Sequence, residues 1–173
     1  PPDAPDWADG DIVMAELHTL SGRHEEGERL AREVIARADR TGLVRTGARA
    51  RRVFAIAVSQ RGDLQVAIHA LEASQETVRE GGWLLDEART NAILARAWGR
   101  AGRTADAVAL LRETVEKLDL IPERDSETRR VLGASLTRLA LAVRDQGDEV
   151  AALTLHRRAA GLHRLERRFQ WLA

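Results

Sequence analysis

Hydrophobic positions recur with helical spacing along this chain, in eight stretches separated by short segments that contain glycine or proline. Four of these breaks contain the glycines Gly22, Gly62, Gly102 and Gly147, which are separated by 40, 40 and 45 residues. A fixed period of this length is typical of stacked helix-turn-helix units, which bury their apolar faces against their neighbours. The pattern predicts helices over residues 8–20, 24–40, 44–60, 64–80, 84–100, 104–119, 126–146 and 149–168.

The residues around the four glycines repeat in the same register. Seven residues before each glycine lies an alanine, preceded by a large apolar residue; the pairs are Met14-Ala15, Phe54-Ala55, Leu94-Ala95 and Leu139-Ala140. Five residues after the glycines lie the small residues Gly27, Ala67, Ala107 and Ala152. Small residues on facing helices allow close approach, and the large neighbour fills the groove between them. The glycine supplies the permissive backbone of the turn.

This register resembles the tetratricopeptide repeat (TPR) family, whose signature runs large-small on the first helix and small-xxx-large on the second. Ala67 with Leu71 and Ala107 with Leu111 match the second part. The period exceeds the family's usual length of about 34 residues, so the chain is similar to the longer-repeat variant of bacterial regulatory and signalling proteins. It departs from the family where an aromatic residue is expected early in the first helix, at Asp11, Arg51, Asn91 and Leu136.

The resemblance implies an all-α fold, an α-α superhelix or TPR-like solenoid of four helix-turn-helix repeats. We expect one repeat domain over residues 1–173, with repeats at about 8–42, 43–82, 83–122 and 123–168 and a C-terminal helix extension at 165–173. Lys117 is the one lysine among 27 basic residues, a bias typical of GC-rich bacterial genomes. Because the chain begins Pro1-Pro2 without a methionine, we expect it to be a segment of a larger protein.

Composition narrows the classes of partner. The 27 basic and 27 acidic residues leave a formal net charge of zero, so no global field attracts nucleic acid or an anionic membrane. The chain has no cysteine, no apolar run of the length that a transmembrane helix needs, and no stretch that resembles a signal peptide. These features predict a soluble, cytoplasmic protein.

Catalytic and metal-binding patterns are not found. His24-Glu25-Glu26 resembles the start of a zinc-protease helix, but Glu28 occupies the place of the required second histidine. His156 and His163 share a helix face without a third ligand at matching spacing. There is no glycine-rich phosphate loop, and no nucleophile can be paired with a base from spacing. We therefore expect no catalytic residue, no metal site and no cofactor.

The remaining candidate site is the concave groove that the first helices of such repeats line. The family's groove positions, carried onto this sequence, give Arg49, Arg52, Ser59, Gln60, Arg89, Asn91, Arg96, Arg100, Thr137 and Arg144 as the peptide- or protein-binding residues, with Ile56 and Leu141 for apolar contact. Guanidinium groups bind carboxylates bidentately, so this groove suits an acidic peptide or a free C-terminal carboxylate. The alternative is that Asp86, Glu87 or Asp145 pairs with these arginines and neutralises the groove.

A second surface lies at the C-terminal end, where apolar residues fall at helical spacing on one face: Leu162, Leu165, Phe169 and Leu172. This stripe either packs on the preceding repeat, forms a homodimer interface, or joins a missing repeat.

The sequence therefore predicts a non-enzymatic protein- or peptide-binding module. The resemblance implies the sensor or assembly region of a bacterial transcriptional or signalling regulator. The alternative is a substrate-recruiting repeat segment attached to an enzyme such as an ATPase or a protease. Nucleic-acid binding through this domain is disfavoured by the zero net charge.

Overall fold

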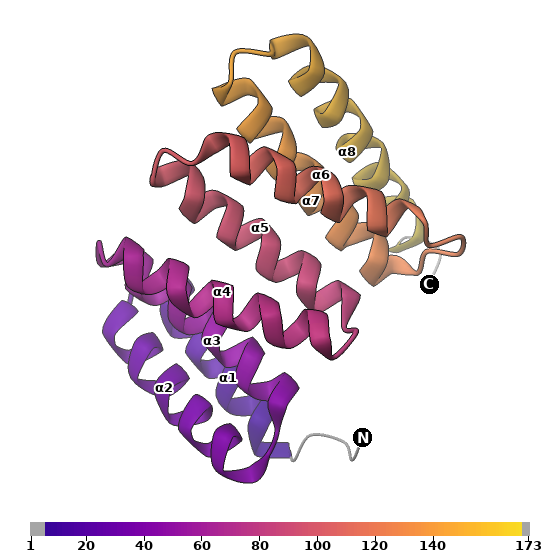
Figure 1. The fold of residues 1–173 in the computed structure, drawn as a ribbon. Helices are drawn as coiled ribbons and strands as arrows, with labels where there is room; N and C mark the ends of the chain where they lie inside the picture. Colours follow the sequence, from indigo (N-terminus) through magenta and orange to yellow (C-terminus); the bar gives the residue numbers. More distant parts are fainter. Residues whose placement is uncertain (1–5, 171–173) are drawn as a thin grey trace. The chain divides into compact units, whose positions relative to one another are not determined.

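The computed structural model describes the backbone of residues 6–170 and, within it, the side chains of residues 9–162 and of Arg164. These residues form eight α-helices and no strand (Figure 1). The helices are α1 (Asp6–Leu20), α2 (His24–Thr41), α3 (Val44–Gln60), α4 (Leu64–Glu80), α5 (Leu84–Arg100), α6 (Thr104–Asp119), α7 (Ser126–Asp145) and α8 (Glu149–Gln170). Every bound lies within two residues of the prediction, because glycines mark six of the breaks between helices and Pro122 marks the seventh.

Consecutive helices form antiparallel hairpins, and the second helix of a hairpin packs on the first helix of the next. In the N-terminal half α1 packs on α2 and α3 packs on α4, while α2 and α1 both contact α3. In the C-terminal half α7 packs on α8 and α6 packs on α7. The turns inside the hairpins need a left-handed residue, as at Gly62, where φ is 104°. An L side chain rarely adopts that conformation.

Small residues lie where helices of a hairpin meet. Ala15, Ala55 and Ala140 are each at most 1% exposed. The first hairpin needs still more room at Gly27, because a Cβ atom there would lie 2.2 Å from Thr19 Oγ1. The sequence motif of small residues therefore marks real close approaches between helices.

The large residues of the same motif are buried in three repeats and not in the first. Phe54 is 7% exposed, Leu94 is 0% exposed and Leu139 is 3% exposed, whereas Met14 is 48% exposed. The groove-filling role expected for this position therefore does not hold for Met14. The physical reason is that α1 is the first helix of the stack, so no described helix covers its outer face.

The connection from α6 to α7 lacks the glycine of the other turns and holds the five extra residues of the last interval. Arg124 replaces the glycine turn by satisfying the end of α6, since its Nη2 donates to the carbonyl oxygen of Asp119 at 2.7 Å. Asp125 then caps α7, because its carboxylate accepts a 2.7 Å hydrogen bond from the backbone N–H of Thr128.

The chain divides into two compact units, Pro1–Ile93 and Leu94–Ala173, with the division inside α5. Each unit is described by itself below, and the single domain over residues 1–173 stays a prediction. None of the described helices is both long enough and apolar enough to cross a membrane.

Candidate functional site

The arginines predicted to line one groove are shared between the two units. Arg49 and Arg52 on α3 and Arg89 on α5 belong to the first unit. Arg96 and Arg100 on α5 and Arg144 on α7 belong to the second. The two sets have different surroundings, and their chemistry differs accordingly.

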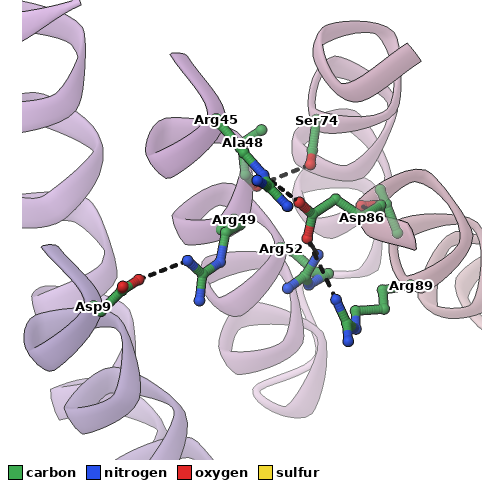
Figure 2. Close-up of polar contacts among 9 residues, drawn as sticks. Asp9, Arg45, Ala48, Arg49, Arg52, Ser74, Asp86 and Arg89 are labelled. Carbon is green, nitrogen blue, oxygen red and sulfur yellow. Dashed lines mark hydrogen bonds and ion pairs between the residues drawn. The ribbon is translucent and has the colours of Figure 1, made fainter. Parts of the chain in front are cut away.

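In the first unit the arginines converge on one buried carboxylate, that of Asp86 in the first turn of α5 (Figure 2). Arg45 Nε donates to Asp86 Oδ2 at 2.7 Å. Asp86 Oδ1 lies 3.5 Å from Arg52 Nη1 and 3.7 Å from Arg89 Nη1. The Asp86 side chain is only 2% exposed and the Arg52 side chain 9%. The four residues are called the Asp86 cluster below.

Opposing effects act on the protonation of this cluster. Burial alone would raise the pKa of Asp86, but the hydrogen bond from Arg45 and the charges of Arg52, Arg45 and Arg49 lower that pKa below its usual value of 3.8. The pKa of Arg52 is also lowered, chiefly by burial, although the charge of Asp86 opposes this shift. Asp86 is therefore a firmly ionised counter-charge that keeps the buried Arg52 guanidinium in place.

The other predicted groove residues of the first unit are also engaged or buried. Arg49 Nη1 donates to Asp9 Oδ1 at 2.6 Å (Figure 2), and Gln75 Nε2 donates to Asn91 Oδ1 at 2.8 Å. Ser59 is buried, and Gln60 is exposed at the last position of α3. In this unit the contacts follow the alternative in which acidic neighbours neutralise the arginines.

The second unit contains a pocket of about 300 Å³ built by α5, α6 and α7. Its lining combines apolar side chains, among them Ala107, Leu111 and Leu141, with four arginines and one aspartate. The charged residues of the lining are Arg96, Arg100, Arg138, Arg144 and Asp145. This space is called the α5–α7 pocket below.

Positive charge is in excess in the α5–α7 pocket. Arg144 Nη2 lies 3.3 Å from Asp145 Oδ1, in a pair whose two side chains are exposed. Within the described residues, neither Arg96 nor Arg138 forms an ion pair with a carboxylate. Burial lowers the pKa of Arg96, and the like charges of Arg138 and Arg100 lower it further. The pocket thus holds guanidinium groups that repel one another beside an apolar wall.

Three of the four pocket arginines, Arg96, Arg100 and Arg144, are among the residues predicted for the groove, and the fourth, Arg138, is not. The missed residue occupies a register position that is apolar in the other three repeats, at Val13, Val53 and Ile93. A break in that apolar pattern was the available signal. Thr137 is not part of the pocket lining, and its hydroxyl donates to the carbonyl oxygen of Gly133 at 2.9 Å.

Three of the apolar residues predicted at the C-terminal end, Leu165, Phe169 and Leu172, lie outside the described side chains. Leu162 is half-buried on α8. The homodimer through this stripe therefore stays a prediction.

Comparison with known proteins relates the chain to others by fold. No family model matches the chain, and no curated protein is similar to it in sequence. The crystal structure of BtubC (BKLC) from P. vanneervenii superposes over 92% of this chain and 64% of that one, with a TM-score of 0.73 and 14% sequence identity. This chain thus spans less than two thirds of that protein's length.

Two further structures come from a Podosopora anserina putative kinesin light chain with nearly identical TPR-like repeats. One matches at 18% identity over 96% of this chain and 99% of that chain, with a TM-score of 0.46. A single-residue variant of the same protein matches at 18% identity over 92% of this chain and 96% of that chain, with a TM-score of 0.47.

The repeated hairpins and the likeness to BtubC define the class of fold. The chain is an all-α protein with a TPR-like helical repeat fold, as the sequence predicted. Stacked hairpins of this kind present an extended surface.

Proposed function

We propose that this chain is a non-enzymatic peptide-binding module and that the α5–α7 pocket receives an acidic group of its partner. The observation that carries the proposal is the position of Arg96 and Arg138, which line a pocket without a carboxylate partner among the described residues. Arg96 is half-buried, and a cation that is partly removed from water normally has a counter-charge, whereas Arg138 is exposed and adds a second positive charge beside it. A bound anion would supply it.

The chemistry of the pocket favours a carboxylate attached to an apolar group. Guanidinium groups bind carboxylates through paired hydrogen bonds, and partial burial strengthens such bonds because less water competes for the charges. Leu111 and Leu141 offer apolar surface beside the arginines. A volume of about 300 Å³ is at the small end of ligand sites, so it suits one or two side chains or a chain terminus of a peptide.

We place this module in the sensor or assembly region of a bacterial, cytoplasmic transcriptional or signalling regulator. The supporting features are the near absence of lysine among the basic residues and the long repeat period. In such a protein, ligand binding at the repeats would favour one conformation and so alter an attached effector.

The test is binding to a peptide array that runs from strongly acidic to strongly basic sequences, each with a free or an amidated C-terminus. We expect acidic peptides to bind, with affinity that falls as salt is added. The double variant Arg96→Glu/Arg138→Glu should lose about a hundredfold in affinity, since the loss of such a charge contact costs about 3 kcal/mol.

Arg112→Glu is the matched control, because Arg112 is an exposed arginine of α6 that does not line the pocket. It should leave the affinity unchanged. Helicity measured by circular dichroism should be equal in all variants. Equal affinity of the double variant and the control, or an array without acidic binders, would refute the proposal.

A further inference from the structure

The outer face of α1 carries large apolar side chains that no described helix covers. Val13 is 47% exposed, Met14 48%, Leu17 49% and Leu20 82%. The face is defined by these four residues. Soluble proteins rarely expose several adjacent aliphatic side chains without an interaction that covers them.

The other repeats show what covers this face. One repeat later in the register, Val53, Phe54 and Ala57 of α3 are buried and Gln60, at the position of Leu20, is exposed; α3 is contacted by α1 and α2 of the preceding hairpin. At the same position Leu139 of α7 is buried, and α6 packs on α7. The α1 face is therefore built to receive the second helix of a hairpin, with the first helix of that hairpin beside it.

The last hairpin of the chain presents the complementary surface. On α2 the stripe that faces α3 includes Glu28, Arg32 and Asp39. Arg32 and Asp39 contact Phe54 and Arg51 of α3, and Glu28 contacts Arg61, which follows the end of α3. The same register positions on α8 are Leu153, Arg157 and Arg164. All three are exposed, so the stripe on α8 has no described helix upon it.

We propose that the occupant of the α1 face is α8 of a second copy of this chain, in a head-to-tail contact that continues the repeat. If α8 packs on α1 of the next copy in the register that α2 has on α3, Arg164 lies beside Asp11. These two residues then stand where Asp39 and Arg51 form a 2.8 Å ion pair between α2 and α3. The charges are reversed and remain complementary.

The apolar parts of the two surfaces also coincide. Leu153 takes the position of Glu28, whose partner Arg61 corresponds to Ser21 beside Leu20, and Arg157 takes the position of Arg32, so that its aliphatic stem would lie on Met14. In the same register α7 of the second copy takes the place that α1 has beside α3. The stripe of Leu153, Arg157 and Arg164 is on the side of α8 opposite to Leu162, so the contact differs from a dimer through the C-terminal apolar stripe.

This contact joins two different surfaces, so it is heterologous and can add further copies. Sedimentation velocity over a wide concentration range at low salt should show an average mass that rises above the monomer value. Asp11→Arg and Arg164→Asp should each raise the dissociation constant about tenfold or more, because each variant sets like charges against one another. Met14→Glu should have the same effect through the apolar part.

A mixture of the Asp11→Arg and Arg164→Asp variants separates this contact from every symmetric one. Each variant repels itself, but in the mixture the altered surface of one meets the altered surface of the other, and the native surfaces also meet. Association should therefore return in the mixture and in the double variant. Glu76→Arg, an exposed charge reversal on α4, is the control and should leave association unchanged.

Thermal melts check that the variants remain folded, since Asp11 also forms an exposed 3.3 Å pair with Arg37. A wild-type chain that is monomeric at every concentration would overturn the proposal. So would association that the single charge reversals do not weaken, or single variants whose mixture does not associate.

Discussion

Removal of the Asp86 carboxylate should destabilise the first unit far more than removal of an exposed carboxylate. In Asp86→Ala the guanidinium of Arg52, whose side chain is 9% exposed, loses its nearest counter-charge. Arg52 Nη1 lacks a hydrogen-bond partner among the described residues, so after the substitution the weaker charge of Glu16 is left to oppose the burial of Arg52. The destabilisation therefore comes from a buried charge left without an ion-pair partner.

The magnitude follows from the exposure of each arginine in the Asp86 cluster. Breaking a buried ion pair from one side costs about 3–5 kcal/mol. Arg45 and Arg89 are 55% and 35% exposed, so water solvates them once Asp86 is removed. Only Arg52 would be left as a buried charge without an ion-pair partner, so we expect a loss of unfolding free energy at the lower end of this range, about 3 kcal/mol. For a chain of this size, that corresponds to a decrease in melting temperature of about 6–12 °C.

Urea unfolding monitored by circular dichroism measures this loss, and Asp39→Ala is the control. Asp39 pairs with Arg51 at 2.8 Å, but its side chain is 55% exposed, so its removal should cost less than about 1 kcal/mol. Adding Arg52→Met to Asp86→Ala should recover most of the loss, because an apolar side chain has no charge to compensate. If Asp86→Ala were no worse than Asp39→Ala, or Arg52→Met gave no recovery, the reasoning would be wrong.

The pH dependence gives an independent check with a definite sign. Folding lowers the pKa of Asp86 below its usual value of 3.8, so the carboxylate stabilises the fold at pH values above that number. The stabilisation is lost as the pH falls through the lower, folded-state pKa. The difference in unfolding free energy between wild type and Asp86→Ala should be constant above about pH 5 and shrink on acidification. A difference that grew in acid would contradict the lowered pKa.

Two further predictions concern glycines. Gly62→Ala should lower the free energy of unfolding by about 1–2 kcal/mol, because φ is 104° at this position. Gly10→Ala should raise it by about 0.5–1 kcal/mol, because Gly10 lies in a helix with open space around the new Cβ. Equal effects of the two substitutions in urea unfolding would contradict the argument. Gly27→Ala should cost about 1–3 kcal/mol through its approach to Thr19 Oγ1, and Thr19→Ala should relieve part of that cost; strictly additive losses in a double-mutant cycle would show that the contact is not the cause.

Most of the fold could be read from the sequence because its information is local and repeated. A glycine at a fixed interval ends each first helix, and a small residue at a fixed distance marks each close approach, so four copies support one another. The exposure of individual residues could not be predicted where it depends on the position of a repeat in the stack. Met14 has the same local pattern as Phe54, yet its exposure is set by the absence of a described helix beyond α1. The contacts of Arg124 at the end of α6 depend on a loop that occurs once.

The candidate site was harder to read, because it depends on charges that lie about one repeat apart. Arg45 and Asp86 are 41 residues apart in sequence and are joined at 2.7 Å, which no local pattern indicates. The sequence named Asp86 as one neutralising partner, but it could not tell which arginines Asp86 reaches. Arg138 was missed for a related reason, because its register position is apolar in the other three repeats.

The register also explains why arginines in the two units differ in their surroundings. Asp86 lies at the start of α5, where it meets arginines that come from α3 of the preceding repeat. The equivalent position of α7 is Val131, a buried apolar residue, and the equivalents of Arg45 and Arg52 on α5 are Leu85 and Ala92, so both sides of this ion pair are absent from the next repeat. An arginine such as Arg52, with an acidic residue about one repeat later in the sequence, forms an ion pair within the fold and has a structural role. An arginine such as Arg96, which has no acidic residue at that distance, keeps a charge that a binding partner can neutralise. The presence or absence of this acidic residue distinguishes the structural arginines from those that we propose bind a partner.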